Sequence, residues 1–254
     1  MNSEPYAGSF IAETGVEVPS VSAEQMRELD RIAIEETGPS LLQMMENAGR
    51  NLALLAMELM GPHWQSAKVL TLAGSGGNGG GGVCAARHLS NHGVAVDLCL
   101  AAPESLSDAV LEQRKIFGFS KGKEVTPGEL SSVKPDLIID ALIGYGLEAS
   151  PRDAAEELIQ WANRTQIPVL SLDVPSGINA TSGNAPGEFI RPRWTMTLAL
   201  PKSGLRAQNT GQVFLADIGI PLAAIHRLAP NYISPFGKRS WIGLKIMHSA
   251  KPAI

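Results

Sequence analysis

The chain has 254 residues, of which 44% are hydrophobic and 18% charged, and its formal net charge is −4. This composition excludes wholesale disorder, and the length suits one large domain. The excess of acidic over basic residues and the lack of a basic stripe exclude a typical nucleic-acid binder. No apolar run reaches the roughly 18 residues of a membrane span, so no membrane partner is expected.

Cysteine usage and the N-terminal residues indicate where the protein works. Cys84 and Cys99 lie in apolar runs and form neither a disulfide framework nor a CxxC metal pair, which indicates a reducing compartment. The segment 1–25 contains no Lys or Arg, so it matches neither a secretory signal nor an Arg-rich presequence. We therefore expect a cytoplasmic protein with a flexible N-terminal extension over residues 1–20.

Two helices are predicted near the start of the chain. Ser22 and Gln25 have the spacing of a capping box, so a first helix begins near Ser22 and ends near Gly38. A second helix runs over about 40–60, and its apolar positions form one stripe that includes several methionines. The simplest interpretation of these methionines is that they fill the core.

From residue 68 onward, apolar strands alternate with helices. The expected strands are 68–73, 94–101, 136–140, 168–173, 195–200 and 213–217. The expected helices between them are 83–90, 107–119 and 154–163, and 240–247 is a candidate for one more short element. Near-continuous apolar strands separated by helices indicate an α/β fold whose mostly parallel sheet is covered on both faces.

The first strand of this series is followed by a glycine-dense loop, 74–82, in which seven of nine residues are glycine. Between a strand and a helix, such a loop lets backbone N–H groups approach a phosphate, helped by the helix dipole. Gly74, Gly76 and Gly79 fit the G-x-G-x-x-G pattern, which is a weak signal in a glycine run, and a flexible turn is the alternative. No Lys-Ser/Thr follows, so a P-loop is excluded.

Two further strand ends carry a carboxylate. Asp140 precedes a Gly-x-Gly turn, and Asp173 precedes the turn Val-Pro-Ser-Gly. Ligands of an open parallel sheet bind beyond the carboxyl ends of its strands, although each Asp could also simply cap its turn. With Asn78 and Ser176 these residues offer hard oxygen ligands, which suit an alkali or alkaline-earth cation rather than zinc.

Several motifs occur together in one order between about Val21 and Leu222. They are MMENAG at 44–49, the glycine loop with AARHL at 85–89, DALIGYGL at 140–147, DVPSG at 173–177, LPK at 200–202 and DIGIP at 217–221. In this combination the chain resembles the YjeF N-terminal domain family, the NAD(P)H-hydrate epimerases. The resemblance implies a single-domain, three-layer α/β/α Rossmann-like fold over residues 21–224, followed by a weakly patterned tail over 225–254.

The same resemblance implies an isomerase that acts in the repair of nicotinamide cofactors. Its substrates would be NADHX and NADPHX, which are hydrated at ring carbon 6 and whose R and S epimers the family interconverts. A potassium ion would be held by Asn78, Asp140 and Ser176. A homodimer is expected, as is a separate ADP- or ATP-dependent dehydratase that acts on the S epimer.

By motif position, Asp173 is the expected catalytic acid and base, with Lys202 nearby. Loss of water at carbon 6 gives an iminium ion, and return of water to either face gives either epimer. One carboxyl group can take both roles, and its negative charge favours the cationic intermediate. The resemblance places further substrate contacts at Gly77, Asn78, Gly79, Gly80, Gly81, Gly144, Tyr145, Gly146, Leu147, Glu148, Ala149 and Ser150.

Two alternative functions stay open on the sequence alone. The family loop usually reads GPGNNGGDG, and here Ser75, Gly77 and Gly81 replace its Pro, its first Asn and its Asp. Loss of an amide and a carboxylate removes contacts to the ligand, which favours as an alternative a catalytically degenerate nucleotide-binding or interaction module on the same fold. An NAD-dependent dehydrogenase would need an acidic residue about 20 positions after the glycines, and the candidate Asp97 falls inside a predicted strand.

Overall fold

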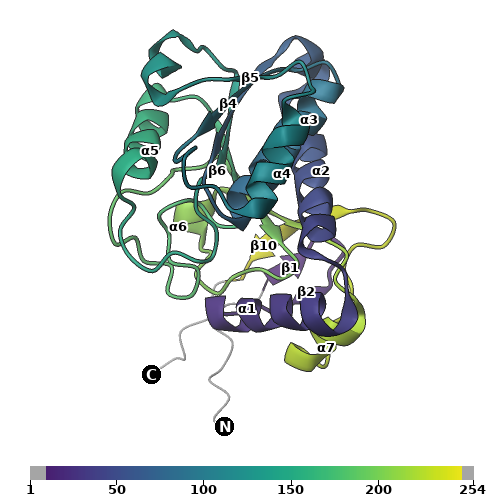
Figure 1. The fold of residues 1–254 in the computed structure, drawn as a ribbon. Helices are drawn as coiled ribbons and strands as arrows, with labels where there is room; N and C mark the ends of the chain where they lie inside the picture. The colour runs from purple at the N-terminus through teal and green to yellow at the C-terminus, as the bar shows by residue number, and fades with distance from the viewer. Residues whose placement is uncertain (1–9, 248–254) are drawn as a thin grey trace.

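The computed structural model describes residues 10–247 as a three-layer α/β/α arrangement around one ten-stranded sheet (Figure 1). The strand order is β2-β1-β10-β9-β8-β7-β6-β3-β4-β5. Neighbours in the stretch β9-β8-β7-β6-β3-β4-β5 pair in parallel, whereas β10, β1 and β2 extend the sheet with antiparallel pairs. The predicted, mostly parallel sheet is thus confirmed. The strands are β1 Phe10–Ala12, β2 Glu17–Val18, β3 Lys68–Ala73, β4 Ala95–Leu100, β5 Lys123–Glu124, β6 Leu137–Ala141, β7 Val169–Leu172, β8 Trp194–Leu198, β9 Gln212–Ala216 and β10 Trp241–Ile246.

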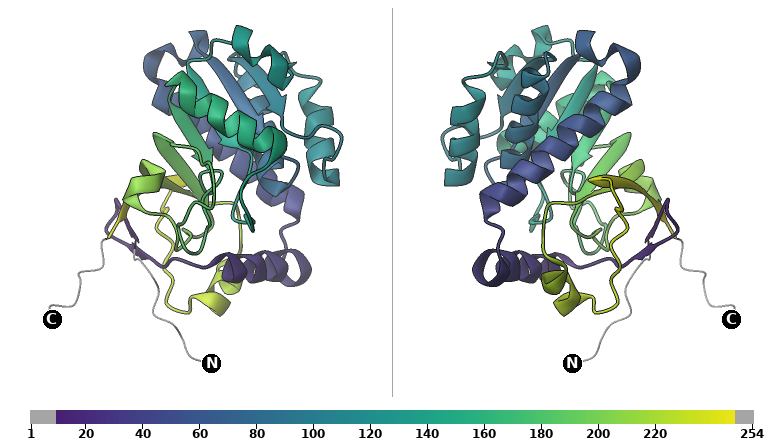
Figure 2. Two further views of the ribbon diagram at one scale, coloured as in Figure 1. Left: turned by 90° about the vertical axis from the view of Figure 1, so that its left-hand side faces the viewer. Right: turned by 90° about the vertical axis from the view of Figure 1, so that its right-hand side faces the viewer.

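Helices cover both faces of the sheet (Figure 2). They are α1 Ala23–Ile32, α2 Leu41–Met60, α3 Gly77–Asn91, α4 Asp108–Phe117, α5 Asp153–Thr165, α6 Ala207–Thr210 and α7 Leu222–Leu228. The predicted capping box at Ser22 is present, and Ser40 forms a second one at the start of α2. Within residues 10–247, no helix combines the length and the apolar content that crossing a bilayer requires.

The period-two alternation of side chains along β3 divides the core between the two helical layers. Val69 and Ala73 pack in the cluster formed with α2 and α3. Leu70 and Leu72 point to the other face and pack in the cluster that contains Leu158 of α5. A sheet buried in this way on both faces explains why the parallel strands read as continuous apolar runs.

The glycine run folds differently from the predicted loop. Only residues 74–76 form a loop, and α3 begins at Gly77, whereas the prediction began the helix at Val83. Glycine is needed here because α3 lies directly on the sheet: a Cβ on Gly82 would be 2.4 Å from the Cβ of Ala141. The glycines therefore allow α3 to pack directly against β6. Their small size matters here more than their backbone flexibility, because most of them lie inside a helix.

Both chain ends also depart from the prediction. The flexible extension expected over 1–20 instead contains two strands, and Phe10 of β1 pairs with Ile246 of β10. The tail expected over 225–254 supplies β10. Residues from both ends of the chain pack in one hydrophobic core cluster, whose members include Phe10, Ala12, Val18, Tyr232, Phe236 and Leu244. Residues 1–9 and 248–254, which these predictions also cover, lie outside the described residues.

Gly82→Ala is expected to lower the free energy of unfolding by about 1–3 kcal/mol, because its methyl group would overlap Ala141. The matched variant Gly77→Ala has nothing within 4 Å of its added Cβ, and we expect it to be neutral or stabilising by up to about 1 kcal/mol. Urea unfolding of both variants measures the difference. Equal stabilities would contradict this packing of α3 on the sheet.

Candidate functional site

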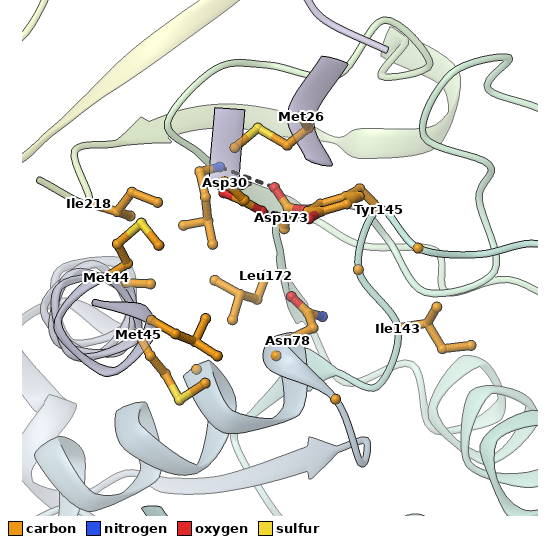
Figure 3. Close-up of a pocket in the computed structure, with 18 of the residues that line it drawn as sticks. Met26, Asp30, Met44, Met45, Asn78, Ile143, Tyr145, Leu172, Asp173 and Ile218 are labelled. Atoms are coloured by element: carbon orange, nitrogen blue, oxygen red, sulfur yellow. Dashed lines mark hydrogen bonds between the residues drawn. The ribbon is translucent and has the colours of Figure 1, made fainter. Parts of the chain in front are cut away.

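A cavity of about 450 Å³ opens at the carboxyl edge of β6, β7 and β8, in the size range of small-molecule sites (Figure 3). One wall is the loop 75–76 with the first turns of α3, and another is the loop 142–146 that follows β6. Side chains from α1 and α2 close the remaining side. This is the edge at which open parallel sheets bind their ligands, as the sequence analysis expected.

Asp173 and Lys202 form a buried ion pair in this wall, with exposed fractions of only 3% and 1%. Lys202 Nζ donates to Asp173 Oδ1 and, at 2.9 Å, to the carbonyl oxygen of Leu198. The N–H of Leu198 at 3.2 Å and the hydroxyl of Thr197 at 3.4 Å also donate to Oδ1. The three bonds that Asp173 accepts through its carboxyl group all end at Oδ1, and no donor within residues 10–247 takes Oδ2.

The backbone holds both members of the pair in place. Asp173 has a φ of 66°, a left-handed conformation that costs a non-glycine residue about 1–3 kcal/mol. Its N–H donates to the carbonyl oxygen of Met196 at 2.7 Å, so the chain turns sharply where β7 ends. On the other side, Val21 forms a parallel bridge with Lys202. The segment just before α1 thus fixes the turn that carries the ammonium group.

Tyr145 links α1 to this ion pair. Its hydroxyl donates to Asp30 Oδ2 at 2.5 Å, and Lys202 Nζ lies 5.7 Å from the centre of its ring, within cation–π range. Burial raises the pKa of Asp30, although the Tyr145 hydroxyl and the Lys202 charge oppose this rise. Sequence reasoning missed Asp30. Its spacing of four residues from Met26, which places both on one face of α1, is the signal that could have found it.

Asp140 and Ser176 lie buried beneath the cavity rather than in its wall. Asp140 accepts hydrogen bonds from Ser176 Oγ at 2.5 Å, from Ser176 N at 3.0 Å, from Ser171 Oγ at 2.7 Å and from Leu142 N at 3.3 Å. Burial raises the pKa of Asp140, and these hydrogen bonds oppose the rise. Ser176 Oγ also accepts from Ile143 N at 2.8 Å, so the loop after β6 is tied to the end of β7.

Asn78, in the first turn of α3, approaches the same loop from the other side. Its Nδ2 is buried with no hydrogen-bond partner, and its side chain packs against Gly144, where a Cβ would lie 3.2 Å from Asn78 Cγ. Asn78 thus packs against Gly144, Ser176 accepts from the N–H of Ile143, and Asp140 accepts from Ser176, which brings an amide, a hydroxyl and a carboxylate to this loop. This set contains no thiol or imidazole, so it fits a hard cation of the kind the sequence predicted.

The predicted substrate-contact residues divide into two groups. Those that line the cavity are Gly77, Asn78, Gly81, Gly144, Tyr145 and Gly146. Those that do not line it are Gly79, Gly80, Leu147, Glu148, Ala149 and Ser150. Gly79 and Gly80 lie on sides of α3 that face protein: a Cβ on Gly79 would lie 1.9 Å from the carbonyl oxygen of Gly74, and a Cβ on Gly80 would lie 2.5 Å from Met45 Cε. Ser150 donates instead to the carbonyl oxygen of Pro186 at 2.8 Å.

Methionines from α1 and α2 form the apolar side of the cavity. Met26, Met44 and Met45 are nearly completely buried, yet all three line the cavity (Figure 3). Met44 and Met45 belong to the helix whose methionines were predicted to fill the core. Leu41 lies beside them and is half-exposed. Apolar periodicity predicts which face of a helix turns inward, but it does not distinguish a face that meets the core from one that meets a ligand.

Outside the cavity, Glu46 of α2 holds three side chains of α3. Arg87 Nη2 donates to Glu46 Oε2 at 2.5 Å, and the thiol of Cys84 donates to the same oxygen at 3.3 Å. His88 Nε2 lies 2.7 Å from Glu46 Oε1. Burial lowers the pKa of His88 despite the carboxylate, and it raises the pKa of Cys84 to about 12. A neutral imidazole and a thiol therefore donate to Glu46 at neutral pH, and together with Arg87 they fasten α2 to α3.

Asp97, the candidate ribose-binding residue of the dehydrogenase alternative, lies far from the cavity. Asp97 lies inside β4, is 6% exposed and pairs with Lys68 Nζ at 2.8 Å. Lys68 is the first residue of β3, so this carboxylate is bound near the amino ends of the strands, away from the cavity. It cannot contact a ribose at the carboxyl edge, and the dehydrogenase alternative has no support from this geometry.

Comparison with known proteins identifies the family. The family model for the YjeF-related protein N-terminus matches residues 41–204. The chain belongs to this family. A protein of Dehalogenimonas lykanthroporepellens named NAD(P)H-hydrate epimerase is 47% identical over 228 residues, which cover 89% of this chain and 93% of that protein. A Salinibacter ruber protein named bifunctional NAD(P)H-hydrate repair enzyme Nnr is 37% identical over 83% of this chain and 42% of its own length.

A solved structure confirms the fold. The crystal structure of yeast ynu0 superposes with a TM-score of 0.76 over 88% of this chain and 99% of the yeast chain, at 24% sequence identity. Both the family resemblance and the three-layer fold that the motifs implied are thus confirmed.

Glu46→Gln is expected to lower the free energy of unfolding at pH 7 by about 1–2 kcal/mol, a figure that allows for the partial exposure of Glu46. The pKa values of Glu46 and His88 are both lowered in the fold, so the unfolded chain binds more protons. The stability that Glu46 contributes is therefore lost as pH falls below about 4.5. Urea unfolding between about pH 5 and 3 should give a shallower pH dependence for Glu46→Gln than for the wild type. Between about pH 7 and 5 the dependence should be steeper, because the carboxylate that raises the pKa of His88 is gone.

The control is Glu58→Gln, an exposed position on the same helix. It should leave both the stability and its pH dependence unchanged. If Glu46→Gln behaves like this control, the cluster does not fasten α2 to α3.

Proposed function

We propose that this chain is an NAD(P)H-hydrate epimerase, an isomerase that interconverts the R and S epimers of NADHX and NADPHX. Family membership and the named epimerase relative at 47% identity support this activity. The observation that carries the proposal is the position of Asp173: a buried ammonium fixes Oδ1, Oδ2 has no donor among residues 10–247, and the residue borders the cavity. A carboxyl group held by one oxygen and open at the other is suited to proton exchange with a bound substrate.

The chemistry follows from that carboxyl group. Protonated Asp173 gives its proton to the hydroxyl at ring carbon 6, the C–O bond breaks, and water leaves. The lone pair of the adjacent ring nitrogen forms the C=N bond of an iminium ion. Water then adds to carbon 6 and returns a proton to the carboxylate, so one water is released and one is taken up. Addition to the opposite face yields the other epimer.

The surroundings of Asp173 support this role electrostatically. The iminium ion is cationic, and a carboxylate beside it lowers the free energy of its formation. Lys202 keeps that carboxylate in place, because its ammonium has Asp173 Oδ1 and the Leu198 carbonyl as partners. The methionine side of the cavity displaces bulk water, which strengthens these charge interactions.

The phosphates of the substrate have a natural position at the start of α3. The first N–H groups of a helix lack partners inside it, and Gly77 and Asn78 present theirs beside the cavity. Asn78, Asp140 and Ser176 would hold a potassium ion there. When bound, this ion supplies positive charge that offsets the phosphates. Asp140 and Ser176 also tie β6 and the loop after it to the turn that follows β7.

Partners follow from the same assignment. We propose that the chain works as a cytoplasmic homodimer and that a separate ADP- or ATP-dependent dehydratase consumes the S epimer. A relative named a bifunctional repair enzyme supports the pairing of two repair steps on one damaged cofactor.

Asp173→Asn is expected to reduce epimerisation by about 10²–10⁴-fold, because it removes the proton-transfer group and keeps the side-chain shape. R-NADHX is supplied in potassium buffer with an excess of an S-specific dehydratase and its nucleotide, and regenerated NADH is followed by absorbance. Asp108→Asn, an exposed position on α4, serves as the matched control and should match the wild type. Wild-type recovery no faster than the reaction without protein would contradict the proposed function.

Potassium is expected to raise the unfolding temperature by several degrees over an equal concentration of N-methylglucamine, because a ligand of the folded state stabilises it by mass action. Asn78→Ala should abolish this rise. Scanning calorimetry in the two chloride salts measures the effect without any substrate. A wild-type unfolding temperature that does not depend on the cation would overturn the assignment of Asn78, Asp140 and Ser176.

A further inference from the structure

Epimerisation places a demand that one carboxyl group does not meet easily. The hydroxyl leaves carbon 6 from one face of the ring, and water must add to the other. A group fixed in one wall of a cavity reaches only the face turned toward it, because efficient proton transfer needs hydrogen-bond contact with the moving oxygen. If the chain is the epimerase proposed above, on which this inference rests, its cavity should contain a second proton-transfer group.

The cavity wall contains a second carboxyl group of the required kind. Asp30 lines the cavity from α1, whereas Asp173 enters it from the end of β7 (Figure 3). Its Oδ2 accepts the hydroxyl of Tyr145, and no donor within residues 10–247 takes Oδ1. Asp30 and Asp173 therefore share one arrangement, in which one oxygen is anchored and the other is free at the cavity.

Tyr145 and Lys202 connect these two carboxyl groups. The hydroxyl of Tyr145 is bonded to Asp30, and its ring packs beneath the ammonium of Lys202, which in turn holds Asp173. These contacts anchor one oxygen of each acid and leave the other oxygen of each at the cavity. Because Asp30 comes from α1 and Asp173 from the end of β7, a flat substrate ring bound between these two elements meets one acid on each face.

The two carboxyl groups differ in their surroundings. Asp173 is paired with the buried ammonium of Lys202. Asp30 is anchored by a neutral phenol, and burial raises its pKa, an effect that the nearby Asp173 charge increases and Lys202 opposes. Arg27 is a further charge that acts on Tyr145. Two acids whose environments differ in this way are suited to opposite roles, one as proton donor and one as acceptor.

We propose that Asp30 is a second catalytic carboxyl group, which serves the face of carbon 6 opposite the face served by Asp173. In one direction, Asp30 donates its proton to the leaving hydroxyl, the C–O bond breaks, and the ring nitrogen lone pair forms the iminium bond. Water then adds to the other face and gives a proton to Asp173 Oδ2, which restores the nitrogen lone pair. The reverse reaction exchanges the two roles, and proton exchange with water in the open cavity resets them.

Asp30→Asn in ¹⁸O-labelled water tests this assignment. Each cycle of water loss and return places ¹⁸O at carbon 6, so mass spectrometry of the separated epimers reports exchange with retention and with inversion independently. The wild type should show both. Asp30→Asn should lower inversion by about 10²-fold, while Asp173 still exchanges the label with retention in one epimer within a few-fold of the wild-type rate.

Reciprocal and matched variants complete the test. Asp173→Asn should also lose inversion but retain label exchange in the other epimer, which a purely structural role of either residue does not produce. Glu28→Gln, an exposed position on α1, should behave as the wild type. Equal losses of exchange and inversion in folded Asp30→Asn, or no loss, would overturn the second-carboxyl proposal alone. Wild-type inversion no faster than without protein would overturn the proposed function as well.

Discussion

The buried pair of Lys202 and Asp173 is the interaction on which the rest of the site depends. Two ionised groups with almost no exposure are stable only if each has further partners, and removal of one member of such a pair typically costs about 3–5 kcal/mol. Here the partners come from the end of β8, and the bridge to Val21 fixes the turn that carries Lys202. The pair therefore joins the strand ends to the segment before α1, and α1 in turn brings Asp30 and Met26 to the cavity.

Small residues make the second half of the site possible. Because α3 lies in contact with β6 at Gly82 and Ala141, its first turn is held at the carboxyl edge beside the loop 142–146. Larger side chains at these positions would push the helix outward and separate Asn78 from Gly144. The glycine run thus sets the distance between the start of the helix, where phosphates are expected, and the carboxylates at the ends of the strands.

The parts of the fold that the sequence predicted well are those with local causes. Capping residues such as Ser22 specify a helix start within one turn, and each parallel strand is an uninterrupted apolar run. The pairing of Phe10 with Ile246 has no such local signature, because its two short strands lie at opposite ends of the chain. At the site, motifs identified Asp173 and Lys202. Asp30 lies outside every quoted motif, and only the packing of α1 on Tyr145 places it at the cavity.

The central claim is that Asp173 Oδ2 exchanges a proton with the oxygen on carbon 6. A crystal structure of the inactive Asp173→Asn variant with bound NADHX tests it most directly, because it shows which protein atom lies next to that oxygen. The account predicts that the free atom of residue 173 lies within about 2.6–3.2 Å of the carbon 6 oxygen, with the nicotinamide ring between α1 and the end of β7. A ring bound elsewhere, or an oxygen in contact only with other groups, would contradict it.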